Sequence, residues 1–212
     1  MIDVERAKKL QKLLGERALR ELDEYPDLDL SELTYVSGVD ASYSRNEVIG
    51  VAVLLDARLL KLITYSTSRK KPQIPYIPGL LAFREAPAVI SALIKLPEKP
   101  DLIVVDGHGL SHPRAFGIAT HIGLVLKTAS IGVAKKPLYG ELKFIEGKEL
   151  IVAHGRTVGA LIKHEGTKLY VSIGYGVSLR SAVKLIECML KPGVKLPLPI
   201  HEADGISKRL RL

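Results

Sequence analysis

Two aspartates stand where apolar runs end. Asp40 follows residues 36–39 and Asp106 follows residues 102–105, and both runs are typical of core strands. A carboxylate buried at such a place is costly unless it is paired or bound to a cation. If the two strands lie side by side, the carboxylates repel each other until a cation binds, and their oxygens suit Mg²⁺ or Mn²⁺. Taken singly, each aspartate is better explained as the cap of a turn or helix. The pair in one basic chain favours a metal site.

Four further polar side chains could take part in the same chemistry. Glu85 is a third acid, although a glutamate just before a proline can also be a first-turn residue of a helix. His112 could move a proton, and Arg114 could bind a phosphate, although a single histidine in a loop is more often structural. Lys135 ends the apolar run 131–134, where its charge could orient a water or stabilise a transition state. A surface lysine would explain it equally.

The amino-acid composition favours some classes of binding partner and excludes some kinds of site. The chain has 31 Lys and Arg against 23 Asp and Glu, and its net charge of +8 would attract nucleic acid. A solvated lysine-rich surface is the alternative. The single cysteine, Cys188, excludes an internal disulfide and a zinc site built on cysteine pairs. We find no 18-residue apolar span and no signal-peptide pattern, and therefore expect a cytoplasmic protein without a membrane segment.

The order of apolar and polar segments predicts the elements that must position these residues. We expect helices over residues 3–24, from about 87 to 96, 117–126 and 178–190, and a short one near the end. We expect strands over 35–41, 48–55, 62–67, 102–105, 129–134, 151–153, 158–162 and 169–173. The first three form an antiparallel meander, and the strands joined by helices pair in parallel. This predicts one α/β domain over residues 1–212, a mixed sheet flanked by helices in the ribonuclease H-like layout.

Five blocks in a fixed order resemble the endonuclease V family across essentially the whole chain. They are GVDASY (38–43), PYIPGLLAFRE (75–85), DGHG followed by HPR (106–114), GIATHIG (117–123) and IGVAK (131–135). The resemblance implies a ribonuclease H-like fold and Mg²⁺-dependent hydrolysis, with Mn²⁺ as a substitute. The bond cut is the second phosphodiester 3′ to a deaminated purine such as inosine, which leaves 3′-hydroxyl and 5′-phosphate ends.

The same resemblance assigns roles to the polar residues. Asp40 and Asp106 become metal ligands, and Glu85, His112 and Lys135 become active-site residues. Asp204 takes an auxiliary catalytic position, although the residues before it, His201 and Glu202, depart from the family pattern.

The resemblance also implies how the substrate is recognised. Pro75, Tyr76, Ile77 and Pro78 match the family's wedge, which separates the strands at the lesion. Two prolines stiffen that loop, although without the resemblance a core-packing turn would be the simpler explanation. The flipped base is expected in a pocket lined by Gly79, Leu81, Gly107, Gly117, Ile118 and Leu138.

The expected partner is deoxyinosine-containing DNA, single- or double-stranded, or RNA that contains inosine, bound by a monomer. The choice between DNA and RNA depends on contacts to 2′-hydroxyls that a sequence does not display. Two rivals stay open. Another ribonuclease H-like nuclease would share the acids but need neither the stiff loop nor the pocket. A binding protein without catalysis would tolerate a broken set of acids, whereas here Asp40, Glu85 and Asp106 are all present.

Overall fold

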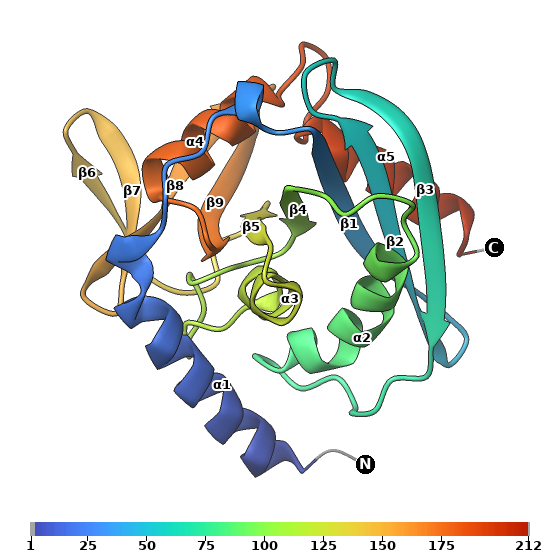
Figure 1. Cartoon of the computed structure of the whole chain (residues 1–212). Helices are drawn as coiled ribbons and strands as arrows, with labels where there is room; N and C mark the ends of the chain where they lie inside the picture. The colour runs from blue at the N-terminus through green and yellow to red at the C-terminus, as the bar shows by residue number, and fades with distance from the viewer. Residues whose placement is uncertain (1–2, 212) are drawn as a thin grey trace.

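One mixed sheet runs through residues 3–211, the part of the chain that the computed structural model describes (Figure 1). Within that part it has nine strands in the spatial order β3-β2-β1-β4-β5-β9-β8-β7-β6. Their bounds are β1 Tyr35–Ser44, β2 Glu47–Asp56, β3 Lys61–Lys70, β4 Leu102–Asp106, β5 Ala129–Ala134, β6 Glu141–Ile145, β7 Lys148–Ala153, β8 Arg156–His164 and β9 Thr167–Tyr175. Strands β1 to β3 form the antiparallel meander, and β1, β4 and β5 are parallel. The predicted ribonuclease H-like α/β fold is therefore confirmed.

Helices cover both faces of this sheet (Figure 1). Their bounds are α1 Val4–Arg20, α2 Leu81–Ile94, α3 Ile118–Leu126, α4 Leu179–Cys188 and α5 Leu198–Arg209, with 3₁₀ turns at Leu22–Glu24 and Leu30–Glu32. Alternate residues of β2 show how the two faces are filled, because Ala52 and Leu54 pack under α2 whereas Val51 and Val53 pack under α5. The single-domain prediction for residues 1–212 stays a prediction, and residues 1, 2 and 212 lie outside the described part.

A glycine brings the C-terminal helix close to the central strand. A Cβ atom on Gly38 of β1 would lie only 1.9 Å from the carbonyl oxygen of Pro199 in α5. Such an approach is open only to glycine, and it places α5 beside the strand that carries Asp40. Two segments at opposite ends of the sequence are thus joined near the predicted site.

Helix α1 packs through a face that its apolar pattern describes only in part. A face that includes Leu10 is the apolar choice, yet Leu10 is 44% exposed and the buried residues are Ala7, Gln11, Gly15 and Ala18. The cause is close packing: a Cβ atom on Gly15 would lie 2.0 Å from the carbonyl oxygen of Arg114. Small side chains therefore line the contact, and Gln11 is enclosed with them.

Three further details differ from the sequence prediction. Helix α2 begins at Leu81 rather than near Pro87, because the turn before Leu81 already ends the irregular segment. Pro87 lies in the helix interior, where its missing N–H removes one backbone hydrogen bond. Strand β6 was not predicted, since all of its residues are exposed and it pairs only with β7. Asp40 lies inside β1 and not at its end, because β1 continues along β2 beyond the point where β4 stops.

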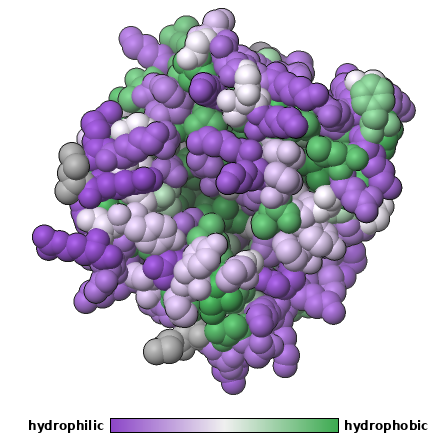
Figure 2. Space-filling view, turned by 180° about the vertical axis from the view of Figure 1, so that it is seen from behind, coloured by the Kyte–Doolittle hydropathy of each residue, from purple (hydrophilic) through white to green (hydrophobic). Residues whose placement is uncertain are grey.

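No helix in the described range 3–211 has both the length and the apolar character needed to cross a membrane. The face of the molecule that is hidden in Figure 1 is mostly hydrophilic (Figure 2), as expected for a chain with a net charge of +8.

Candidate active site

The two predicted metal ligands lie on adjacent parallel strands. The register pairs Val39 of β1 with Val105 of β4, so Asp40 and Asp106 occupy the next position on each strand. Burial raises the pKa of Asp106 to about 6, and the negative charge of Asp40 adds to that shift. Burial also raises the pKa of Asp40. The structure therefore brings Asp40 close enough to oppose the ionisation of Asp106.

A third carboxylate reaches the same place from α2. Glu85 is 9% exposed, and its Oε1 accepts a hydrogen bond of 2.6 Å from the hydroxyl of Tyr43. Burial raises the pKa of Glu85 to about 7, and the charges of Asp40 and Asp106 contribute. Because Glu85 is the fifth residue of α2, it lies beyond the first turn of the helix, which was the alternative explanation for this acid. Three acids from β1, β4 and α2 thus share one electrostatic site.

Charged residues from β5 and α5 complete this group. Lys135 directly follows β5, and its positive charge lowers the pKa of Asp106, whereas Asp204 of α5 raises it. Asp204 is paired with Lys208 one turn later, with 2.6 Å between Oδ2 and Nζ. Lys208 also lowers the pKa of Asp106. The predicted residues Lys135 and Asp204 therefore come together with the acids, and Lys208 is an addition that the sequence did not suggest.

The residues present fit a divalent cation. Oδ2 of Asp40 is buried and has no hydrogen-bond partner among the described residues, so a buried acceptor is left for a ligand. No group of three or more His, Cys, Asp or Glu side chains in residues 3–211 is arranged to hold a metal ion. Mg²⁺ is usually bound by one or two protein carboxylates together with water and substrate phosphates, and Asp40 with Asp106 provides such a pair.

All six residues predicted for the base pocket line one cavity of about 220 Å³. Its walls also include Tyr76, Pro78, Ala82, His108 and His112. A cavity of about 150 Å³ is enough for a benzene ring, so this one can accommodate a larger flat base. Gly107 belongs to the wall and directly follows Asp106, so the cavity adjoins the carboxylates.

The predicted wedge loop stands at the mouth of this cavity. Tyr76 is 68% exposed and contributes to the cavity wall, as does Pro78. Ile77 is only half-buried and packs against a cluster that includes Ile74 and Leu80. Within the wedge loop, Tyr76 is thus the more exposed side chain, while Ile77 also contacts the apolar cluster beneath the loop.

His112 and Arg114 are both bound to the backbone of this loop. His112 is 3% exposed, and its Nε2 lies 3.1 Å from the carbonyl oxygen of Gly79. Nη2 of Arg114 donates to the same oxygen at 2.7 Å, and its Nε donates to Oε1 of Gln11 at 2.6 Å. The structure thus places both residues at the loop that forms the cavity wall.

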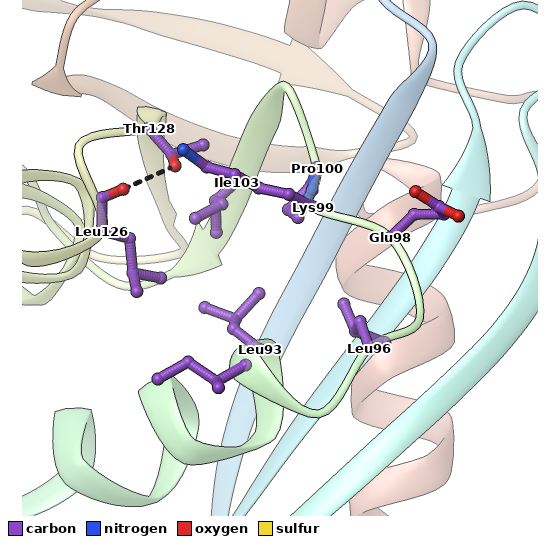
Figure 3. A pocket seen from close by; sticks show the side chains of 9 residues that line it. Leu93, Leu96, Glu98, Lys99, Pro100, Ile103, Leu126 and Thr128 are labelled. Carbon is purple, nitrogen blue, oxygen red and sulfur yellow. Dashed lines mark hydrogen bonds between the residues drawn. The ribbon is translucent and has the colours of Figure 1, made fainter.

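A larger cavity of about 320 Å³ lies elsewhere and is a poorer candidate. Leu93, Leu96, Ile103 and Leu126 form its apolar lining, with Lys99 at the rim (Figure 3). It lies near the start of β4, whereas Asp106 ends that strand. Glu98 and Lys99 are the only ionisable side chains that line it, so it lacks the grouped acids of the other site.

Three residues that contribute to the candidate site escaped the sequence prediction. Gln11 lies four positions after Ala7, on the buried face of α1. A polar residue at such a position indicates a buried hydrogen bond, and this is the signal that could have identified it. Tyr43 lies within a block that resembles the family, but its bond to Glu85 joins two distant segments. Lys208 is one of several basic residues near the C-terminus, and only the fold distinguishes it from the others.

Comparison with known proteins places this arrangement in a family. The family model for endonuclease V matches residues 17–205. The endonuclease V of Desulfurococcus amylolyticus is 57% identical over 207 residues, which cover 97% of this chain and 94% of the relative.

Solved structures agree with the sequence comparison. The endonuclease V of Streptomyces avermitilis superposes with a TM-score of 0.85 at 34% identity, and the match covers 99% of this chain and 93% of that one. The enzyme of Ciona intestinalis, in complex with a 24-mer DNA containing an inosine followed by a ribo-adenosine, superposes with a TM-score of 0.79 at 26% identity. That match covers 95% of this chain and 94% of the other. By sequence and by structure, the chain belongs to the endonuclease V family of nucleases.

Proposed function

We propose that the protein is a Mg²⁺-dependent endonuclease that recognises inosine and related deaminated purines in DNA. It hydrolyses the second phosphodiester bond 3′ to the lesion and leaves 3′-hydroxyl and 5′-phosphate ends, as a cytoplasmic monomer that serves DNA repair. The observation that carries this proposal is the direct succession of Asp106 and Gly107, which joins a group of acids to a cavity suited to a flat base. The inosine-containing DNA bound by the Ciona relative supports the choice of substrate.

Asp40 and Asp106 would hold the metal ion, and Mn²⁺ would substitute for Mg²⁺. When bound, the ion polarises the phosphoryl oxygens and lowers the pKa of an attacking water. Lys135 adds a positive charge beside Asp106, where it offsets negative charge that develops at the phosphate. Glu85, held by Tyr43, orients water at the edge of the site, and Asp204 holds Lys208 near the same phosphate.

The cavity supplies selectivity through its backbone. Hypoxanthine differs from adenine by a carbonyl and a ring N–H in place of the amine, so the two bases present different donors and acceptors. Peptide groups at Gly79, Gly107 and Gly117 belong to the cavity wall and can meet the edge of the base directly. A buried polar group that meets the wrong partner costs about 1–3 kcal/mol, which is enough to reject adenine at this edge.

Replacement of Tyr76 by alanine is expected to weaken binding of an inosine-containing duplex by about tenfold, because stacking of a base on an aromatic ring contributes about 1–3 kcal/mol. Binding of the same duplex with adenine in place of hypoxanthine should change by less than twofold, since the ring of Tyr76 would contact the nucleic acid only where a base has left the stack. The measurement is fluorescence anisotropy with each duplex. Equal losses for the two duplexes would argue against a wedge.

The experiment that tests the proposed function is digestion of matched oligonucleotides with Mg²⁺, followed by mapping of the cut. Four strands of one sequence are compared, with inosine or adenosine in DNA and in RNA. We expect one cut at the second bond 3′ to inosine and far slower cleavage of the adenosine strands. Cleavage of an unmodified RNA–DNA hybrid at a similar rate would instead indicate another ribonuclease H-like nuclease. A DNA strand with one ribonucleotide after the inosine separates the DNA and RNA preferences, because it adds a single 2′-hydroxyl.

A further inference from the structure

A tight turn connects the wedge loop to α2. The N–H of Leu80 donates to the carbonyl oxygen of Ile77 at 2.9 Å, and Gly79 has a φ of 79°. With proline at its second position and a glycine of positive φ at its third, this is a type II turn. The peptide group that joins Gly79 to Leu80 is thus fixed at its N–H end.

The other end of this peptide group is fixed by two side chains from a distant loop. The carbonyl oxygen of Gly79 accepts hydrogen bonds from Nη2 of Arg114 at 2.7 Å and from Nε2 of His112 at 3.1 Å. A side chain at Gly79 would be strained by the positive φ, and its Cβ would lie 2.6 Å from Nη2 of Arg114, which would have to move. The wall of the cavity is therefore held in one orientation by groups outside the turn.

The hydrogen bonds of His112 define the state of its ring. The backbone N–H of Arg114 donates to Nδ1 of His112 at 3.1 Å, so the proton of the neutral ring resides on Nε2, which donates to Gly79. Burial lowers the pKa of His112 to about 4, and the charge of Arg114 adds to this effect. With both ring nitrogens engaged, the imidazole has no nitrogen left for a phosphate or for proton transfer.

Helix α1 supports this arrangement from behind. Gln11 is fully buried, accepts a hydrogen bond from Nε of Arg114 at 2.6 Å and donates from Nε2 to the carbonyl oxygen of Phe116 at 3.2 Å. The side chain of Arg114 is thereby held by two of its nitrogens, one on the helix and one on Gly79. The guanidinium group of Arg114 donates to two acceptors that lie in different directions, and the single ammonium group of a lysine cannot reproduce this geometry.

We propose that Gln11, His112 and Arg114 form a Gly79 clamp, a set of positioning residues that orients the wall of the cavity and thereby determines selectivity for inosine. This inference rests on the proposed function and replaces the role at the phosphate expected for His112 and Arg114. The clamp acts through the peptide group between Gly79 and Leu80, which borders both Tyr76 of the wedge loop and the predicted base pocket.

The test measures selectivity as the ratio of kcat/KM for an inosine-containing DNA strand to that for the same strand with adenosine. Gln11→Leu, Arg114→Lys and His112→Ala should each lower the ratio about tenfold, because each removes at least one hydrogen bond that holds the Gly79 wall. Cleavage of the adenosine strand should change less than twofold. His112→Gln should retain most of the ratio, because its amide can donate to Gly79. Lys12→Ala is the matched control, since it removes an exposed positive charge from the same helix and should leave the ratio unchanged.

The outcomes separate this inference from the proposed function. A ratio near one for the wild-type protein would overturn the proposed function together with the clamp. A high wild-type ratio that persists in the folded Arg114→Lys and Gln11→Leu variants would overturn the clamp alone. Equal losses on both strands in His112→Ala and His112→Gln would also overturn it, because a ring that binds phosphate or transfers a proton would give that result. Arg114→Lys keeps the charge, so it remains informative even if His112→Ala does not fold.

Discussion

Replacement of Asp40 or Asp106 by alanine should lower Mg²⁺-dependent cleavage of inosine-containing DNA at least about a thousandfold, which corresponds to about 4 kcal/mol of transition-state stabilisation. The reason is that the two carboxylates occupy neighbouring positions on β1 and β4, where they would hold one ion between them. An ion that polarises the phosphoryl group contributes several kcal/mol, and neither carboxylate alone positions it. Single-turnover cleavage with saturating enzyme measures the chemical step directly.

The matched control for these variants is Glu16→Ala. Glu16 is an exposed acid on α1, so its removal changes the net charge by the same amount and should leave cleavage unchanged. Binding of the inosine strand should remain measurable in both aspartate variants, because the wedge loop and the cavity are intact. Full activity in either aspartate variant would exclude that residue as a metal ligand.

Asp106→Asn is expected to make the metal-free protein more stable than the wild type at pH 8. The pKa of Asp106 in the folded protein is about 6, above its ordinary value of 3.8, so the native state holds the proton more tightly than the unfolded chain. The stabilisation from that proton is complete below about pH 4 and is lost as the pH rises through 6. At pH 8 the ionised carboxylate therefore costs the native state up to about 3 kcal/mol, which asparagine avoids.

Thermal unfolding in EDTA at pH 8 and at pH 4 measures this effect. The variant should exceed the wild type by roughly 6 to 12 °C at the higher pH and by little at the lower pH. Mg²⁺ should raise the Tm of the wild type but not that of the variant, since only the native wild type binds the ion. Glu16→Gln serves as the control and should show no difference at either pH. A variant that is less stable than the wild type at pH 8 would refute the electrostatic cost assigned to Asp106.

The central strands were predictable because burial on both faces leaves a clear pattern. Residues 102–105 and 129–134 are short apolar runs, and β4 and β5 occupy these positions to within one residue. Strand β6 was missed because Glu141–Ile145 has no buried face, so its strand character comes only from pairing with β7. The buried face of α1 departs from its apolar pattern at Leu10 and Gln11, because the contact depends on close approach at Gly15, a feature that hydrophobicity does not record.

The acidic part of the candidate site was predictable because the residue type alone indicates metal binding. Asp40 and Asp106 stood out as acids among apolar residues, and family blocks named the residues that line the cavity. The roles of Gln11 and His112 were not accessible in this way. Gln11 bonds to Arg114, which lies 103 residues away in the chain, and His112 bonds to Gly79, which lies 33 residues away. Such partners appear only once the chain is folded.

The most direct measurement is the anomalous scattering of Mn²⁺ in crystals of the protein with an uncleaved inosine-containing strand. We predict a Mn²⁺ peak within direct ligand distance of a carboxylate oxygen of Asp40, a carboxylate oxygen of Asp106 and a phosphate oxygen of the strand. A peak bound to only one of the two aspartates, or located away from both, would contradict the shared metal site on which the proposed nuclease activity depends.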